Sequence, residues 1–203
     1  MTAIIDYDAG NLRSVEKALK ALEEEVVITR DPDVILRADR VILPGVGSFG
    51  DAMERLHRHD LADVIRQVVR QKTPFLGICL GLQLLFERSE ESPGVEGLGI
   101  LKGEILRIPE QKGMKVPHMG WNSLKIRPKT RLFAGIADEA YVYFVHSYYL
   151  KARDEAQVAA STEYITYIHA AVEWENVAAC QFHPEKSGDV GLAILKNFTT
   201  WER

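Results

Sequence analysis

The sequence lacks the features that mark disulfide-rich, membrane-spanning or nucleic-acid-binding proteins. It contains two cysteines in 203 residues, too few for a disulfide framework. No apolar run has the length of a membrane span and no signal peptide is recognisable, so we expect a cytoplasmic protein. A net charge of −4 without any block of basic residues argues against a nucleic-acid partner. The six histidines are not paired at zinc-site spacing, so we expect no metal and no cofactor.

Length and hydrophobic patterning predict one α/β domain over residues 1–203. A chain of this length with 46% hydrophobic residues can form one substantial core. Short apolar runs first alternate with amphipathic ones, which is typical of strand and helix units around a parallel sheet. After Gly94, short alternating runs predict antiparallel strands between Leu101 and Gln181. We therefore expect a mostly parallel central sheet flanked by helices, with additional antiparallel strands in the C-terminal half.

Several helices and strands can be placed by their local signals. A short helix should begin at Asp31-Pro32, because proline is favoured in the first helical turn. The last helix should pack on the core through Val190, Ile194, Phe198 and Trp201. The expected strands cover residues 3–6, 26–29, 40–43 and 73–78, and further helices cover 12–22, 51–70 (one helix broken near residue 60, or two) and 190–201.

Cys79 lies where an apolar strand pattern turns into a helix pattern, with Gly77 and Gly81 on either side. Glycines relieve crowding in a sharp strand-to-helix turn, so a thiol there projects above the sheet edge. The helix start also favours the thiolate through its unpaired amides and dipole. The alternative is a buried structural cysteine, which is our interpretation of Cys180.

His183 and Glu185 follow the end of a second apolar strand, in the run Val177–Lys186. A carboxylate bonded to one imidazole nitrogen fixes the tautomer, so that the other nitrogen faces a nucleophile. We therefore interpret His183 as a base for Cys79 and Glu185 as its orienting residue. Taken alone, the same residues fit a surface histidine and a solvated charge pair of Glu185 and Lys186 better, and it is their combination with the cysteine elbow that favours the base and its orienting residue.

Two strings, Gly77–Gln83 and Gln181–Glu185, together resemble the triad (class I) glutamine amidotransferases, which have a flavodoxin-like fold. The strings Pro44–Gly50, Pro117–Asn122 and Tyr143–Tyr148 are similar to the glutaminase branch that serves imidazole glycerol phosphate synthases. The resemblance implies a glutaminase with a Cys-His-Glu triad and a covalent thioester intermediate. It also implies a heterodimer with a barrel-shaped, HisF-type cyclase subunit, which uses the released ammonia to make imidazole glycerol phosphate and an aminoimidazole carboxamide ribonucleotide in histidine biosynthesis.

The glycines of the Pro44–Gly47 loop would let backbone amides approach a ligand, as an oxyanion hole requires, although they also fit an ordinary turn. The resemblance implies oxyanion donors on the backbone of Val46 or Gly47 and of Leu80. Val46 stands where the broader class has a second glycine, and a β-branched residue resists positive φ. We therefore hypothesise that this peptide rests with its carbonyl toward the site until the partner reverses it, so that the lone subunit is nearly inactive.

Substrate contacts are expected close to the elbow. Gln83 lies one helical turn after Cys79, where its amide either holds the main-chain groups of glutamine or faces solvent. The resemblance favours the first interpretation. It also implies that Glu91 neutralises the substrate ammonium, unless Glu91 belongs to a solvated acidic loop, and that the backbone at Ser147 and Tyr148 holds the substrate carboxylate.

An ammonia-delivering subunit also needs an interface around its active site. Tryptophan and methionine are typical interface anchors, although a strand tryptophan is more often a core residue. Lys186 is the strongest candidate because it is closest to the triad in sequence. The predicted interface residues are Asn11, Met119, Trp121, Asn122 and Lys186.

Three other functions remain open from the sequence. A cysteine peptidase or γ-glutamyl hydrolase could share the elbow and the histidine, but it would act without a partner. A glutaminase subunit of another synthase would keep the triad and differ in its partner-facing strings. A catalytically dead binding module is disfavoured by the intact set of Cys79, His183 and Glu185.

Overall fold

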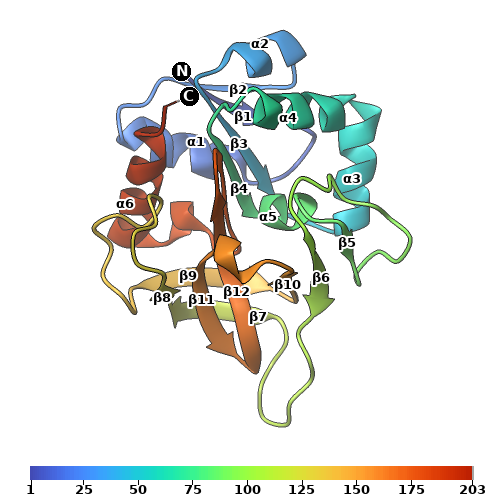
Figure 1. The fold of residues 1–203 in the computed structure, drawn as a ribbon, viewed down its shortest axis with the longest axis vertical. Helices are drawn as coiled ribbons and strands as arrows, with labels where there is room; N and C mark the ends of the chain where they lie inside the picture. The colour runs from blue at the N-terminus through green and yellow to red at the C-terminus, as the bar shows by residue number, and fades with distance from the viewer. Residues whose placement is uncertain (203) are drawn as a thin grey trace.

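The first half of the chain alternates strands and helices around a parallel sheet (Figure 1). The computed structural model describes residues 1–202. Its first elements are β1 (Thr2–Ile5), α1 (Leu12–Ala21), β2 (Val26–Thr29), α2 (Pro32–Arg37), β3 (Arg40–Gly45), α3 (Phe49–Arg58), α4 (Leu61–Arg70), β4 (Phe75–Cys79) and α5 (Leu80–Leu84). The helices and strands predicted for this part of the chain are therefore confirmed, with small shifts at their ends.

The second half is dominated by antiparallel strands, as predicted. Its elements are β5 (Arg88–Ser89), β6 (Gly103–Arg107), β7 (His118–Ser123), β8 (Lys125–Ile126), β9 (Tyr141–His146), β10 (Tyr148–Ala152), η1 (Glu155–Gln157), β11 (Val158–Tyr164), β12 (Thr166–Trp174), β13 (Val177–Cys180), η2 (Pro184–Lys186) and α6 (Gly188–Thr199). Two pairings differ from the prediction, because β13 is parallel to β4 and β5 is parallel to β6. The final helix ends before Trp201, which is nevertheless buried and packs on Phe198.

The large sheet changes from parallel to antiparallel at β13. Nine of its eleven strands follow the order β2-β1-β3-β4-β13-β12-β10-β6-β5. β11 pairs with β12 off this path and β8 pairs with β11, while β7 and β9 form a separate two-stranded sheet. In the β4–β13 pair, Cys180 lies opposite Ile78. This register brings the residues that follow β13 beside the end of β4, where Cys79 is located.

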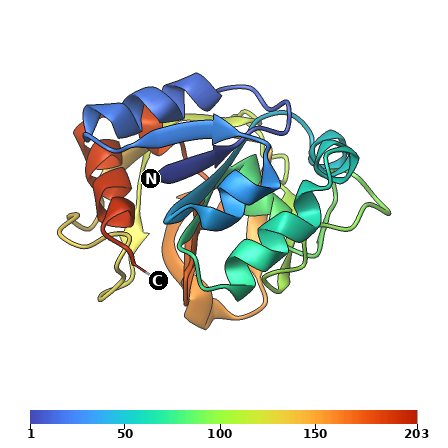
Figure 2. The ribbon, with the colours of Figure 1, turned by 90° about the horizontal axis from the view of Figure 1, so that it is seen from above.

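Two hydrophobic cores fill the two faces of the sheet, because successive strand residues point to opposite sides. Ala3 and Ile5 belong to the core covered by α2, α3 and α4. Ile4, between them, belongs to the core covered by α1 and α6. The view from above shows α1 and α6 on one side of the strands and α3 and α4 on the other (Figure 2). Within residues 1–202, no helix is both long and apolar enough to cross a bilayer.

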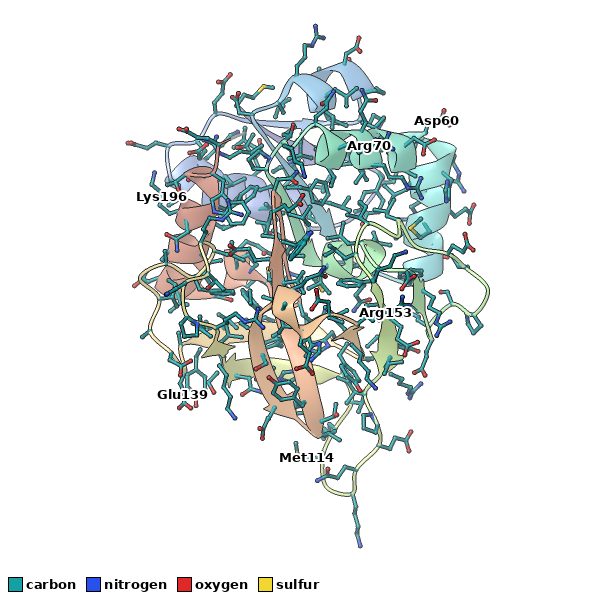
Figure 3. All side chains as sticks on the ribbon, in the orientation of Figure 1. Asp60, Arg70, Met114, Glu139, Arg153 and Lys196 are labelled. Carbon is teal, nitrogen blue, oxygen red and sulfur yellow. The ribbon has the colours of Figure 1, made fainter. Side chains whose placement is uncertain are left out.

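Local signals explain where the helices begin and end. Asp31 caps α2, since its side chain accepts a hydrogen bond from the Asp33 amide. Asp60 separates α3 from α4 with a left-handed backbone (φ 54°) at the corner labelled in Figure 3. The predicted break near Asp60 is therefore confirmed.

Candidate active site

Cys79 occupies a strained turn between β4 and α5. Its backbone dihedral angles (φ 56°, ψ −110°) are ones that residues other than glycine rarely adopt. The neighbouring glycines make the turn possible: a Cβ on Gly81 would lie 1.8 Å from the Leu43 carbonyl oxygen, and one on Gly77 would lie 2.7 Å from the Gly81 carbonyl oxygen. The predicted sharp strand-to-helix turn at Cys79 is confirmed, and Cys79 lines a pocket.

His183 and Glu185 form a buried pair beside this elbow. Nδ1 of His183 lies 2.8 Å from Oε1 of Glu185, and neither side chain is more than 2% exposed. Nε2 of His183 is buried without a hydrogen-bond partner among the described residues. Burial alone would lower the pKa of His183, but Cys79 and Glu185 raise it to about 9. The interpretation of a surface histidine beside a solvated charge pair is therefore wrong.

Asn11 contacts this pair from the loop before α1. Its Nδ2 donates to Oε1 of Glu185 over 2.5 Å. The same carboxylate oxygen therefore accepts hydrogen bonds from both Asn11 and His183. A Cβ on the preceding Gly10 would lie 2.9 Å from Cγ2 of Val46. The loop that carries Asn11, a predicted interface residue, therefore lies against both Glu185 and Val46.

One pocket of about 380 Å³ unites most of the predicted site. The predicted residues that line it are Val46, Gly47, Cys79, Leu80, Gln83, Glu91, Ser147, Tyr148, His183 and Lys186. Pro117, Val145 and His146 also line the pocket; they were not predicted as site residues, although each lies within a string that carried the family resemblance. Residues from distant parts of the chain therefore meet at the carboxyl end of β4.

The Pro44–Gly47 loop begins within the last two residues of β3 and enters the pocket at Val46 and Gly47. Gly47 has a φ of +102°, which favours glycine, while Val46 avoids positive φ and is 39% exposed. Tyr7, which sequence reasoning missed, lies behind the loop: a Cβ on Gly45 would be 2.4 Å from its hydroxyl oxygen. Burial, and to a smaller extent Cys79, raise the pKa of Tyr7 well above its ordinary value.

Gln83 faces the protein interior and is 5% exposed, so the solvent-facing interpretation is wrong. Its Nε2 donates to the Tyr148 carbonyl oxygen over 3.1 Å and to Oε1 of Gln181 over 3.0 Å. Both hydrogens of the side-chain amide are engaged. Only its oxygen, Oε1 of Gln83, therefore remains to accept a hydrogen bond from a ligand.

Glu91 caps a helix. Its Oε2 accepts from the Phe49 amide over 2.8 Å at the first residue of α3, and Oγ of Ser92 accepts from the Gly50 amide. A carboxylate is favoured at a helix N-terminus. Glu91 is half-buried and lines the pocket, so the solvated-loop interpretation is wrong for this residue.

Two further histidines were missed at the sequence level: His146, which lines the pocket, and His118, which contacts His146 from β7. Nδ1 of His118 is 3.0 Å from Nε2 of His146, whose Nδ1 is 2.8 Å from the Tyr148 carbonyl oxygen. Burial lowers the pKa of His118 to about 4 and that of His146 to about 3, so both rings are neutral near pH 7. The pair holds the backbone of Tyr148 in place.

The β7 strand presents large apolar side chains to solvent beside the pocket. Met119 is 62% exposed and Trp121 is 55% exposed, so the alternative of a core tryptophan is wrong. Asn122 is half-buried and donates to the Glu163 carbonyl oxygen over 3.0 Å. Lys186 is exposed at the pocket.

Cys180, the second cysteine of the chain, belongs to the core. Cys180 is fully buried, and burial raises the pKa of its thiol well above the ordinary value, which confirms it as a strand residue in the core. Among the described residues, no group of three or more histidines, cysteines or carboxylates is arranged to hold a metal ion.

Comparison with known proteins gives consistent matches. Residues 3–200 match the family Glutamine amidotransferase class-I. The chain is 50% identical over 198 residues to "Imidazole glycerol phosphate synthase subunit HisH" of Methanocaldococcus jannaschii, covering 98% of both chains. Proteins with the same name from Aquifex aeolicus and Bacillus cereus are 50% and 51% identical, with coverage of 97% and 98% of this chain and 95% and 93% of theirs.

Solved structures share the fold at much lower identity. A structure described as a glutamine amidotransferase has a TM-score of 0.75 at 20% identity, covering 98% of this chain and 99% of that chain. The glutaminase domain of Trypanosoma brucei CTPS has a TM-score of 0.68 at 15% identity, covering 100% and 94%. These likenesses extend over the whole architecture.

Proposed function

The chain belongs to the class-I glutamine amidotransferase family, and from this premise we propose that it is the glutaminase subunit of an imidazole glycerol phosphate synthase. It hydrolyses L-glutamine to glutamate and ammonia, as a single glutaminase domain over residues 1–203. The ammonia passes to a cyclase subunit that makes imidazole glycerol phosphate in histidine biosynthesis. The observation that carries this proposal is the buried His183–Glu185 pair beside the strained Cys79 elbow, in a chain half-identical to such subunits.

Cys79 and His183 share the chemistry of the two half-reactions. With a pKa of about 9, His183 holds a proton at neutral pH and pairs with a Cys79 thiolate. The thiolate attacks the side-chain amide carbon of glutamine, and His183 gives its proton to the departing nitrogen, which leaves as ammonia. Neutral His183 then removes a proton from water, whose oxygen attacks the thioester and releases glutamate and the thiolate. Glu185 fixes the imidazole tautomer and stabilises its charged form.

Backbone amides would hold the oxygen of the tetrahedral intermediate. The donors are the amide of Leu80 and that of Val46 or Gly47, all of which line the pocket. The partner switches activity by reversing the peptide at Val46, because a β-branched residue resists the positive φ that an inward amide needs. Losing one such donor lowers turnover by about 10²- to 10³-fold, which is enough for a gate.

The substrate amino acid is held at the other end of the pocket. The Gln83 carbonyl oxygen and the Glu91 carboxylate face its ammonium group, since both are acceptors that line the pocket. The backbone at Ser147 and Tyr148 binds the carboxylate of the substrate.

The partner is a barrel-shaped, HisF-type cyclase subunit, bound as a heterodimer in the cytoplasm. Its contacts are Met119, Trp121 and Asn122 on β7, together with Lys186 and Asn11. Exposed methionine and tryptophan side chains are favoured interface anchors, and here they lie on β7, where Met119 pairs with the pocket residue Val145.

Glutamate release tests the proposal directly. We expect low activity of the purified chain alone, a large increase when the cyclase subunit and its ribonucleotide ligand are added, and no activity in Cys79→Ala. Cys180→Ala is the matched control, because Cys180 is a buried core residue, and it should respond like the wild type. High activity without the partner would contradict the Val46 gate, whereas no activity with glutamine under any condition would contradict the glutaminase function.

A further inference from the structure

A buried glutamine, Gln181, contacts the sulfur of the nucleophile. It is fully buried, and its Nε2 lies 3.8 Å from Sγ of Cys79. A thiol is a weak acceptor, but a thiolate accepts a stronger, charge-assisted hydrogen bond. We propose that Gln181 stabilises the Cys79 thiolate by donating to Sγ, and that Gln83 is the positioning residue that orients its amide. The inference rests on the proposed function, in which Cys79 is the nucleophile.

The direction of the Gln181 amide follows from a group that cannot reverse, the backbone carbonyl of Tyr148. This acceptor lies 3.1 Å from Gln83 and requires the nitrogen of the Gln83 amide there. The second hydrogen on that nitrogen donates to Oε1 of Gln181. With its oxygen engaged, Gln181 turns its nitrogen toward Cys79. Reversing either amide would place two donors or two acceptors against each other.

The Tyr148 carbonyl is itself held by the two buried histidines. His146 donates to it from Nδ1, and Nε2 of the same ring therefore accepts from Nδ1 of His118. Nε2 of His118 then accepts from Nδ2 of Asn122 over 3.3 Å. Each group in this series of hydrogen bonds has one consistent donor and acceptor assignment, because burial keeps both imidazole rings neutral.

Gln181 differs from the other groups that face the sulfur, because it cannot titrate. His183, with Glu185 behind it, interacts with Cys79 through a charge that depends on pH, since the two neighbours raise its pKa to about 9. The Tyr7 hydroxyl and the Cys180 thiol are close enough to interact with Cys79, and burial keeps both in their neutral forms. The Gln181 amide therefore donates to Sγ at any pH and favours the thiolate over the thiol.

Alkylation of Cys79 by iodoacetamide across a pH series tests this role without glutamine or a partner. In Gln181→Leu, we expect the pH of half-maximal reactivity to rise by about one unit and the rate near neutral pH to fall by about tenfold. Gln83→Leu should give a smaller shift in the same direction and add nothing to Gln181→Leu, because it acts only through that residue. Phe198→Leu, in the core away from the pocket, should destabilise the fold and leave the profile unchanged.

A second measurement uses intact protein, in case Gln181→Leu does not fold. In a ¹⁵N–¹H NMR titration, the side-chain amide of Gln181 should shift with the same midpoint as Cys79 alkylation, and this shift should be absent in Cys79→Ala. An unchanged alkylation profile in folded Gln181→Leu, or a Gln181 amide signal that ignores the Cys79 titration, would overturn the proposal. Both readouts remain interpretable if glutamine turnover is never detected, so this failure is distinct from failure of the proposed function.

Discussion

At the residue scale, His183 holds its proton more tightly than its burial would allow alone. Burial disfavours the imidazolium, but the neighbouring Cys79 and Glu185 outweigh that effect and raise the pKa to about 9. Asn11 supports this arrangement, because it donates to the same oxygen of Glu185 that His183 contacts. A hydrogen bond to a carboxylate favours its charged form, and the charged form favours the imidazolium.

This linkage predicts a pH dependence of stability. The folded-state pKa of His183 lies above its ordinary value of 6.5, so the stabilisation is fully present below that pH and is lost as the pH rises through about 9. Glu185→Gln removes one cause of the raised pKa. Between about pH 6 and about pH 9.5, the unfolding free energy of this variant should therefore fall less than that of the wild type, by about 1–2 kcal/mol.

Urea unfolding at a series of pH values would measure this difference. Glu163→Gln is the matched control, because Glu163 is an exposed glutamate paired with Lys125 and should leave the wild-type pH profile unchanged. Parallel profiles for Glu185→Gln and the wild type would show that Glu185 does not control the His183 proton.

At the element scale, local signals were sufficient to place most helices and strands. The Asp31-Pro32 start, the break near Asp60 and the glycines around Cys79 each act over a few residues, and each was identified correctly. The parallel pairing of β13 with β4 could not be read locally, because it joins strands about a hundred residues apart. The resemblance to a known family, rather than periodicity, brought Ser147 and Tyr148 into the predicted pocket, whereas His183 was predicted from its place at the end of a strand.

The hydrogen-bond partners of the site residues could not be predicted from the sequence. On spacing alone, Gln83 was equally suited to facing solvent and to binding substrate. Only the fold reveals that its amide nitrogen donates to the Tyr148 carbonyl oxygen and to Oε1 of Gln181. Asn11 was assigned to an interface, yet its side chain reaches Glu185 across the fold. Such polar contacts depend on tertiary geometry within a few tenths of an ångström, which residue spacing does not encode.

The close approach of α5 to β3 predicts that Gly81 tolerates no side chain. A Cβ there would lie 1.8 Å from the Leu43 carbonyl oxygen, and neither backbone can move without disturbing the elbow. Gly81→Ala should lower the unfolding free energy by about 3 kcal/mol or more and reduce alkylation of Cys79. Thermal and urea unfolding would measure the loss.

Gly94→Ala separates this clash from ordinary glycine strain. Gly94 has a φ of +84° and open space around its Cα, so alanine there should lower the unfolding free energy by about 1–2 kcal/mol and leave Cys79 reactivity unchanged. Equal losses in the two variants would contradict the view that α5 is held tightly against β3.

At the scale of the whole molecule, reactive and docking features gather at one end of the sheet. The pocket lies at the carboxyl end of β4, next to the small β7–β9 sheet with its exposed Met119 and Trp121. Trp174 marks the opposite end, since it pairs with Val177, which in turn lies opposite Phe75 at the start of β4. Exposure alone does not distinguish the two tryptophans, but their distance from the pocket does.

We therefore expect Trp121 to be an anchor of the partner interface and Trp174 to be a bystander. Trp121→Ala should weaken binding of the cyclase subunit by about 2 kcal/mol or more, which is typical of an interfacial tryptophan, while changing the unfolding free energy by less than about 1 kcal/mol. Trp174→Ala, at 44% exposure, is the matched control and should bind the partner like the wild type. Isothermal titration calorimetry would measure both affinities, and glutamate release at saturating partner would test whether a weakened complex still activates. Equal affinities of the two variants would place the interface away from β7.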